Sequence, residues 1–384
     1  MTTEFALGVS HHSPADSFRT GTDHVPSGKG SERMTMLADQ VDLVIGVDTH
    51  KHTNTAAVVV AATGAVLEEL TVPTDLDGHR AVFEVAVARG SRRLWAIEGT
   101  SSYGSGITRF LREQGEWVIE LERPRRTARH GGKKSDPLDA VRAAREALAQ
   151  SESGEPRSTG DRAALGVLLA ARRSAVDART DTQRQIHSLI VSAPEALRER
   201  FRGKTTRQIL DIATRLRTNA RNDTEMNTTV IVLRRLARRV LELEAETHEH
   251  ERNLSEIVRA WRPDLLEECG VGPIVAATVL CAWSHQGRFR SEGAFASLAG
   301  AAPIPASSGM TVRHRLNRGG DRQLNRALHV VVINRIRVDK ETRAYVERRR
   351  AEGKGDKEIK RCLKRYVARQ LFRQLENPGG LGSL

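Results

Sequence analysis

Cysteine is scarce in this chain of 384 residues, and its three cysteines, Cys269, Cys281 and Cys362, lie far apart. Their spacing matches neither a zinc site, whose ligands come in close pairs, nor a disulfide framework. The longest apolar run, residues 274–283, is far shorter than the roughly 20 residues that span a membrane. We therefore expect a reduced cytoplasmic protein with no zinc, no disulfide and no membrane partner.

Aromatic residues are also few, at 4% of the chain, whereas the hydrophobic content of 39% is sufficient for a folded core. Acidic charge is sparse in one region in particular. Residues 310–374 contain 20 Lys and Arg against 7 Asp and Glu, a difference equal to the net charge of the whole chain, +13. Such one-sided basicity favours a polyanionic partner, most simply nucleic acid, and a merely solvated basic face is the alternative.

The first 38 residues lack the apolar core of a signal peptide and are rich in Ser, Thr, Gly and His. We expect a disordered tail there, and either Met34 or Met36 could be the natural start. The rest of the chain is too long for one small core, so several domains are expected. The expected boundaries after the 1–38 tail are 39–152, 153–262, 263–340 and a basic tail, 341–384.

A short β-branched stretch, residues 43–47, predicts a buried strand that runs into Asp48. A carboxylate at the carboxyl end of a core strand is poorly placed for packing and well placed to hold a metal in a crevice. Taken alone, Asp48 could equally open a polar turn. His50 and His52 are expected to be solvent-facing residues of that turn rather than further metal ligands.

Residues 39–152 predict the element order β-β-β-α-β-α-β-α, beginning with an antiparallel meander, which is the order of the ribonuclease H-like (RuvC-like) fold. The first helix is expected to start at Thr74. In this order Glu98 ends the fourth strand, and Asp136 and Asp139 open the last helix. Residues three apart share one face of a helix, so both aspartates could face the crevice. The alternatives are a helix cap for Asp136 and a favourable first-turn charge for Asp139.

Four carboxylates at these positions form a hard oxygen-ligand set, which favours Mg²⁺ or Mn²⁺. Two such ions about 3.5–4 Å apart could clamp both oxygens of a phosphoryl displacement. A basic loop that leads into this set would position a phosphodiester, with a solvated loop as the alternative. The loop residues that we expect to contact nucleic acid are Arg125, Arg126, Lys133 and Lys134.

The middle of the chain predicts two long amphipathic helices, about 161–191 and 230–258, joined by a polar connection over about 194–228. We expect an antiparallel coiled-coil stalk. The apolar stripe of its second helix is narrow and nearly heptad-like, which favours self-association over packing within the chain alone. The stripe consists of Leu233, Leu236, Val240 and Leu243.

Residues 265–283 predict two short helices around Gly270 and Gly272, a helix-hairpin-helix pattern in a helical C-terminal domain. Its glycines would bring backbone amides close to a phosphate. A turn at Ser307 and Ser308 follows, flanked by prolines and cations. A serine among arginines could attack a phosphodiester, although a Ser-Gly loop that only caps or contacts phosphate fits the composition as well. The cations expected to contact nucleic acid here are Arg313, Arg315, Arg318 and Arg322.

The strings IGVDTHK (45–51), EGTSSY (98–103) and KKSDPLDA (133–140) resemble the N-terminal part of IS110-family transposases, and residues 300–328 resemble the second, serine-bearing domain of that family. The resemblance implies a DNA transposase with a DEDD catalytic domain like that of Holliday-junction resolvases. The catalytic residues that it implies are the metal-binding Asp48, Glu98, Asp136 and Asp139, and the nucleophile Ser308, with Ser307 as the fallback.

The resemblance also implies partners that the sequence does not show. These are donor and target DNA, a guide RNA encoded by the element, and further copies of the chain in a dimer or tetramer. The coiled-coil region would mediate that assembly, so that the two half-sites could come from different protomers. The protein would then act in the bacterial cytoplasm, associated with the nucleoid.

Other functions fit parts of the pattern. The carboxylates alone would suit a metal-dependent Holliday-junction-type nuclease that uses water, and the basic regions alone would suit a non-enzymatic nucleic-acid-binding scaffold. An actin-like ATPase also opens on a strand that ends in Asp, but a glycine-rich phosphate loop would then follow. Here Asp48 is followed by Thr-His-Lys-His, which argues against the ATPase.

Overall fold

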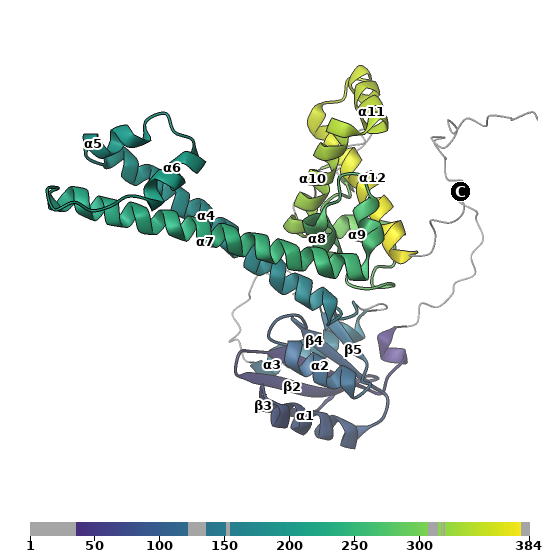
Figure 1. The fold of residues 1–384 in the computed structure, drawn as a ribbon. Helices are drawn as coiled ribbons and strands as arrows, with labels where there is room; N and C mark the ends of the chain where they lie inside the picture. The colour runs from purple at the N-terminus through teal and green to yellow at the C-terminus, as the bar shows by residue number, and fades with distance from the viewer. Residues whose placement is uncertain are drawn as a thin grey trace, which may run out of the picture.

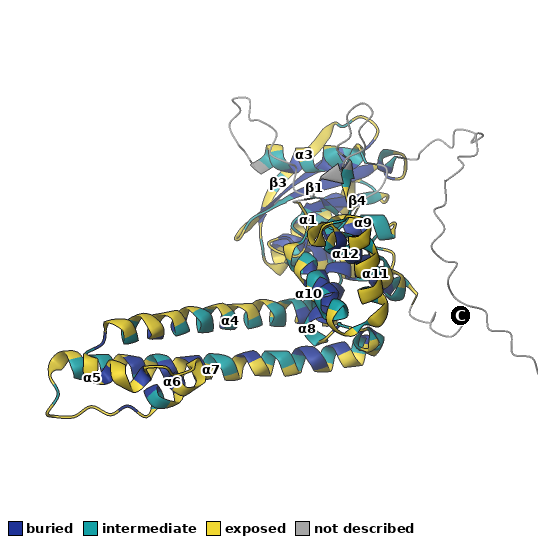
Figure 2. Ribbon diagram, turned by 90° about the horizontal axis from the view of Figure 1, so that it is seen from above, coloured by how far each residue is buried: buried dark blue, intermediate teal, exposed yellow. Residues whose placement is uncertain are grey.

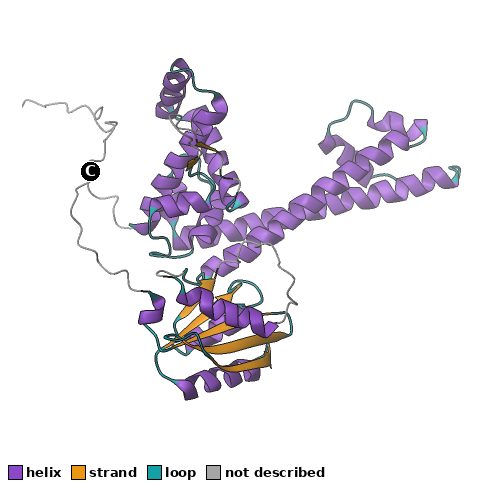
Figure 3. Cartoon of the chain, turned by 180° about the vertical axis from the view of Figure 1, so that it is seen from behind, coloured by secondary structure: helices purple, strands orange, loops and turns teal. Residues whose placement is uncertain are grey.

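The computed structural model describes residues 36–121, 136–150, 154–305, 314–315, 317 and 319–377. This part of the chain forms a mixed α/β fold with a five-stranded sheet, a pair of long helices that reach away from it, and a group of C-terminal helices (Figure 1). Apart from two very short strands, every strand lies in the sheet, as the orange arrows in Figure 3 show. No helix of the described part is long and apolar enough to cross a membrane.

The strand order of the sheet is β3-β2-β1-β4-β5. Strands β1 (Leu43–Thr49), β2 (Thr53–Val60) and β3 (Val66–Pro73) form an antiparallel meander. Strand β4 (Arg93–Glu98) pairs in parallel with β1, and β5 (Val118–Leu121) pairs in parallel with β4. The predicted mixed sheet and its meander are confirmed, and the arrangement is consistent with a RuvC-like fold.

Helices cover both faces of the sheet because successive strand residues point to opposite sides. Helices α1 (Leu76–Arg89) and α2 (Ser105–Glu113) pack with Ile45 on one face. Helix α3 (Asp136–Leu148) packs with Val44 on the other face.

Two boundaries in the first domain differ from the prediction. Helix α1 is capped by Asp75 rather than Thr74, and the Asp75 carboxylate accepts a hydrogen bond from the amide of Gly78 at 2.9 Å. A 3-10 helix, η1 (Leu37–Asp39), precedes the sheet, and its Leu37 is buried in the same cluster as α3. The folded part therefore includes residue 37, which the expected 1–38 tail would have left out.

Helices α4 (Asp161–Ser192) and α7 (Thr224–Trp261) lie side by side and project from the sheet in Figures 1 and 2. The connection between them is more than a polar loop. It contains α5 (Glu195–Arg198), η2 (Glu199–Phe201) and α6 (Thr206–Thr214). These short elements bury an apolar cluster against α7 that includes Leu197, Phe201, Ile209 and Leu210.

This cluster decides how the apolar stripe of α7 is used. Leu233 and Val240 are completely buried in it, together with Val230 and Ala237. Leu233 and Val240 of the stripe are therefore covered within one chain, whereas Leu236 and Leu243 are only half-buried. The buried half of the stripe gives no argument of its own for self-association.

The C-terminal helices share one hydrophobic core. They are η3 (Pro263–Glu267), α8 (Pro273–Trp283), α9 (Glu292–Leu298), α10 (Arg322–Val338), α11 (Lys340–Ala351) and α12 (Asp356–Glu376).

Two features of this part differ from the expectation. The first helix of the expected helix-hairpin-helix is only the 3-10 helix η3. Residues 341–377, expected as part of a tail, form α11 and α12, and α12 buries Leu371 and Leu375 in the shared core.

Candidate active site

Asp48 and Glu98 lie at the same end of neighbouring parallel strands. The register pairs Val47 with Ile97, so the two carboxylates occupy the next matched positions of β1 and β4. The Asp48 side chain is only 14% exposed, and its Oδ2 lies 3.2 Å from Nε2 of His50. His50 thus contacts the carboxylate and is not simply the solvent-facing residue that we expected.

A tight turn holds the end of β4 in place. Gly99 has a φ of +68°, a conformation that favours glycine. The amides of Ser102 and Gly104 both donate hydrogen bonds to the Gly99 carbonyl, at 2.8 and 3.1 Å. The Thr49 hydroxyl donates to the Glu98 carbonyl at 3.0 Å, which ties the carboxyl ends of β1 and β4 together.

Helix α3 begins at this same edge of the sheet. It runs antiparallel to β1, because Arg145 near its C-terminal end donates to the carbonyl of Gly64, in the turn beside the start of β1, at 3.1 Å. The helix lies very close to β1. A Cβ on Gly46 would lie 2.6 Å from the Ala144 amide nitrogen and would overlap the Ala140 carbonyl oxygen.

Gly46 is therefore a positioning residue that the sequence reading missed. The signal was present, because a glycine inside a strand often marks the close approach of another backbone. Gly46 admits α3 at this short distance from β1, and Asp139 lies in the first turn of that helix.

Asp139 is half-buried and pairs with Arg142 on the same helix at 3.1 Å. Asp136 is the first residue of α3, and its side chain lies outside the described residues. Among the residues that the structure describes, no three His, Cys, Asp or Glu side chains lie close enough together to hold a metal ion. The donor type nevertheless fits a hard divalent cation, because Asp48 and Glu98 offer carboxylate oxygens at matched strand ends, and Asp139 carries a third carboxylate in the helix that packs against β1.

Ser307 and Ser308 lie outside the described residues, but both ends of their segment are placed. Ile304 and Pro305 (β6, Ile304–Pro305) pair antiparallel with Arg315 and His314 (β7, His314–Arg315). We call this strand pair between α9 and α10 the hairpin, and residues 306–313, which carry both serines, come between its two strands in the sequence.

Glycines close the base of this hairpin. Gly300 and Gly320 have φ values of +61° and +99°, and a Cβ on Gly320 would lie 3.1 Å from the Gly300 amide nitrogen. The Asp321 amide donates to the Leu298 carbonyl at 2.7 Å. We call residues 298–300 and 319–321 the hairpin neck. The neck fixes where the serine-bearing hairpin leaves the helical core.

Most of the cations expected to contact nucleic acid are not placed by the structure. Arg315 is described by its backbone alone, and Arg322 is exposed in the first turn of α10. The others lie outside the described residues: Arg125, Arg126, Lys133, Lys134, Arg313 and Arg318.

The two glycines expected to approach a phosphate differ from each other. Gly272 is exposed and has open space around the position of a Cβ. Gly270 has a φ of +83°, and its Cβ would lie 3.1 Å from the Val331 carbonyl oxygen of α10. The need for glycine at position 270 is therefore explained by packing against α10.

A short connection joins the sheet to the C-terminal helices. The Glu120 amide on β5 donates to the Gly154 carbonyl at 2.7 Å. Four residues later, the Ser158 amide donates to the Ser284 hydroxyl at 2.8 Å, at the end of α8. His285 Nε2 also lies 2.9 Å from a carboxylate oxygen of Glu155. The connection, residues 154–158, is thus hydrogen-bonded to the sheet at one end and to the end of α8 at the other.

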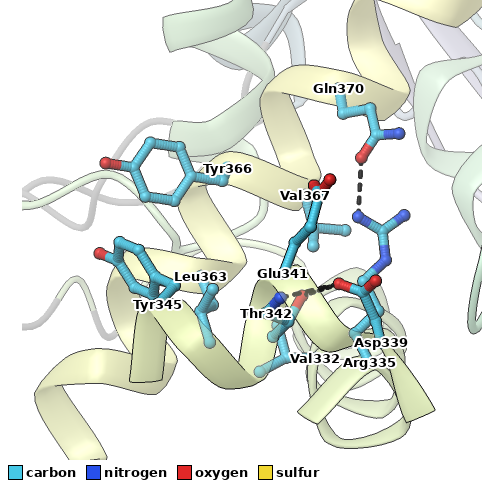
Figure 4. Close-up of a pocket in the computed structure, with 10 residues that line it drawn as sticks. All are labelled: Val332, Arg335, Asp339, Glu341, Thr342, Tyr345, Leu363, Tyr366, Val367 and Gln370. Atoms are coloured by element: carbon cyan, nitrogen blue, oxygen red, sulfur yellow. Dashed lines mark hydrogen bonds between the residues drawn. The ribbon is translucent and has the colours of Figure 1, made fainter. Parts of the chain in front are cut away.

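A cavity of about 360 Å³ lies among α10, α11 and α12, away from the sheet (Figure 4). Its polar groups bond to one another, since the Thr342 amide donates to Asp339 at 2.9 Å and Arg335 donates to Gln370 at 2.7 Å. Burial, followed by the neighbouring Tyr366, raises the pKa of Tyr345 to about 12. We assign this cavity no part in the chemistry.

Comparisons with known proteins agree on one kind of protein. A family model described as Transposase (DEDD_Tnp_IS110) matches residues 45–193, and one described as Transposase IS116/IS110/IS902 family matches residues 264–347. A similar curated protein is the "Insertion element IS900 uncharacterized 42 kDa protein" of Mycobacterium paratuberculosis, 34% identical over 32% of each chain.

A second similar protein is the "Insertion element IS110 uncharacterized 43.6 kDa protein" of Streptomyces coelicolor. It is 34% identical over 30% of this chain and 29% of its own length. The match thus spans about a third of the length of each of these two relatives.

Proposed function

Since the chain belongs to the IS110 family of insertion-sequence transposases, we propose that it is a DNA recombinase that cuts and rejoins strands with two half-sites. The observation that carries the proposal is the sheet edge. Two carboxylates, Asp48 and Glu98, occupy matched strand ends, and α3, which carries Asp139 in its first turn, packs closely against β1. Such an arrangement suits phosphoryl transfer, in which positioning and charge stabilisation supply most of the catalysis.

The first half-site is formed by Asp48, Glu98, Asp136 and Asp139. These residues would hold Mg²⁺ or Mn²⁺, which would supply positive charge to the oxygens of the scissile phosphate. His50, 3.2 Å from Asp48, orients that carboxylate, and the link from Thr49 to the Glu98 carbonyl keeps the two strand ends together.

The second half-site is formed by the serine-bearing hairpin. The hydroxyl of Ser308, or that of Ser307, attacks the phosphorus of a DNA phosphodiester, and its proton passes through water to the deoxyribose oxygen that leaves. A bond forms between Oγ and phosphorus, and the bond to the leaving deoxyribose oxygen breaks. The hydroxyl of a second strand then attacks the phosphoserine, which restores the serine and joins the strands. Nearby arginines, including Arg322 at the start of α10, stabilise the charge on the phosphate.

The partners in this proposal are donor and target DNA, a guide RNA encoded by the element, and further copies of the chain. The excess of Lys and Arg over residues 310–374 supports a nucleic-acid partner. The RNA and the oligomer rest on the family alone.

A covalent intermediate gives the decisive test. Purified protein is incubated with end-labelled DNA that carries the element end and Mg²⁺, and labelled protein is detected on a denaturing gel. Ser308→Ala should abolish both the adduct and strand joining, whereas Ser307→Ala, its matched neighbour, should retain both. The reverse result would identify Ser307 as the nucleophile. An adduct in both single variants would overturn the serine mechanism.

A junction nuclease that uses water is the second candidate, because all four carboxylates come from elements within residues 43–148. It predicts that Ser308→Ala still cleaves DNA without an adduct. A non-enzymatic scaffold predicts instead that Asp48→Asn and Glu98→Ala leave every activity unchanged.

A further inference from the structure

Positive side chains gather between α10 and α12, close to the hairpin neck. Lys364 of α12 is half-buried, and its Nζ donates to Oδ1 of Asn325 on α10 at 2.8 Å. Its hydrogen-bond acceptor there is a neutral amide. Burial, followed by the charge of Arg361, lowers the pKa of the Lys364 ammonium group.

His329 lies one helical turn beyond Asn325 on α10, and it too is half-buried. Burial lowers the pKa of its imidazole, and the charges of Lys364 and Lys360 lower it further. The charges that act on His329 and Lys364 are thus all positive. We call His329, Lys360, Arg361 and Lys364 the cation cluster.

Holding like charges together in partly desolvated positions opposes folding. Elsewhere on α12, an acidic residue of α9 offsets the repulsion between neighbouring cations. Arg365 and Arg369 both reach Glu292 at the start of α9, at 3.5 and 2.8 Å. Arg373 reaches it as well, at 3.4 Å. One acidic residue therefore serves three arginines, whereas Lys364 in the cluster is bonded to an amide. Lys360 and Arg361 lie close enough to Asp356 and Glu358 of the same helix for their charges to act on those carboxyl groups. No acidic residue of the described part is among the charges that shift the pKa of Lys364 or His329, so an anion from outside the chain would supply the missing negative charge there.

The cation cluster is connected to the hairpin neck through Asn325. The Asn325 amide group donates to the Ala299 carbonyl at 2.6 Å, and a Cβ on Gly300 would lie 3.4 Å from its nitrogen. Lys364 is therefore two hydrogen bonds away from the backbone at which the serine-bearing hairpin leaves α9. An anion held by the cluster would lie on the side of the neck that faces α10 and α12.

We propose that His329, Lys360, Arg361 and Lys364 bind a backbone phosphate of the DNA strand that enters the serine half-site. Lys364 has a second role as a positioning residue, since it holds Asn325 against the hairpin neck. The inference rests on the proposed function for the identity of the strand. Cations that contact phosphate fix the register of a strand without reading its bases.

The first experiment measures binding, which needs no cleavage. Full-length Lys360→Met and Lys364→Met are compared with Lys357→Met, which removes an exposed charge from the first turn of the same helix. Affinity for duplex DNA is measured by fluorescence anisotropy from low to high salt. We expect each cluster variant to bind about tenfold more weakly and to lower the slope of log K against log[salt] by about 1, as the loss of one phosphate contact requires.

Lys357→Met should change affinity less than about twofold, because an exposed lysine away from the strand is screened by salt. Equal losses in all three variants would show that the cluster is not a site, and would overturn the proposal. Unchanged binding of duplex DNA together with weaker binding of single-stranded RNA would assign the cluster to RNA, which also overturns it.

The second experiment separates a binding role from a structural one. Lys360→Met keeps the bond from Lys364 to Asn325, so it should leave the melting temperature of the nucleic-acid-free protein unchanged or raise it. Inorganic phosphate should raise the melting temperature of the unmodified chain more than that of this variant. A lower melting temperature with the same response to phosphate would make Lys360 structural and overturn its role. Ser308→Ala should bind DNA normally, so failure of the serine mechanism remains distinguishable from failure of the cluster.

Discussion

The two proposed half-sites are built in different ways. At the sheet edge, Asp48 and Glu98 are fixed by the hydrogen-bond register of β1 and β4, and α3 is fixed against Gly46. The serine hairpin is attached through its neck, where the main links are the bond from Asp321 to Leu298 and the Asn325 amide. The sheet edge is thus positioned by three elements of one core, and the described strands of the hairpin are held by the residues at their base.

The difference matches the chemistry proposed for each side. Carboxylates that hold a divalent cation must be in place before the ion arrives, which favours positions on rigid strands and helices. A serine nucleophile must reach a strand that enters and leaves, so attachment at a neck next to cations suits it. Four predictions examine this contrast, from the largest expected effect to the smallest.

Removing the charge of Asp48 should have the largest effect. We expect Asp48→Asn to reduce strand cleavage at least about 10³-fold, equivalent to about 4 kcal/mol of transition-state stabilisation. The measurement is the rate of cleavage under single-turnover conditions, with folding checked by circular dichroism. Asp77→Asn is the control, because that side chain is 94% exposed on α1. Cleavage within tenfold of normal in Asp48→Asn would remove the sheet edge from the mechanism.

A methyl group on Gly46 should disrupt the sheet side structurally. Gly46→Ala forces the backbone of α3 away from β1, and we expect the free energy of unfolding to fall by about 3 kcal/mol. The rate of hydrogen exchange at the amides of β1 and α3 measures this loss of stability locally. The same substitution at Gly166, inside α4 with its nearest neighbour 4.0 Å from the new Cβ, should instead stabilise by about 0.5–1 kcal/mol. Equal effects at the two positions would mean that the close approach is unimportant.

The corresponding change at the neck should have a smaller effect that stays local. Gly320→Ala places a Cβ against the Leu298 carbonyl at a φ of +99°, and we expect a cost of about 2 kcal/mol. Exchange of the Asp321 amide should accelerate while β1 amides stay protected. Gly319→Ala is the adjacent control and should change stability by less than about 0.5 kcal/mol. Loss of protection in β1 would show that the two half-sites are not independent.

Low pH should destabilise the C-terminal helices through Asp264. Arg262 donates to both Asp264 oxygens, at 2.7 and 2.6 Å, and this hydrogen bonding holds the pKa of Asp264 below its usual range. Arg262 also donates to the Gln374 carbonyl of α12 at 2.9 Å, so the pair joins the end of α7 to α12.

A carboxyl group whose pKa is lower in the folded state stabilises the protein above its unfolded pKa. That contribution is lost as the pH falls through the folded pKa. Asp264→Asn should therefore cost about 1.5 kcal/mol at neutral pH, and the difference from the unmodified chain should shrink below about pH 4. Urea unfolding followed across pH measures it. Asp211→Asn, which breaks an exposed pair with Arg215, should show little change at any pH. A difference for Asp264→Asn that does not depend on pH would exclude the ion pair as its cause.

Much of the first domain could be predicted from the sequence because its signals are local. Alternating apolar residues and turn residues predict the strands and helices in order, and they place Asp48 and Glu98 at strand ends. The long helices α4 and α7 were predicted for the same reason. Such patterns show that a residue is buried, but they do not show what covers it.

The tertiary structure alone decided the features that depend on residues far apart in the chain. It covered Leu233 and Val240 of the α7 stripe with α5 and α6, and it placed α12 in the C-terminal core. It also brought Gly46 to the backbone of α3, and Lys364 through Asn325 to the hairpin neck. The contacts of Gly46, Lys364 and Asn325 join residues between 26 and 98 positions apart, at distances that local propensity does not set. The sequence thus determined which residues could perform the chemistry, and the packing decided how each half-site is held.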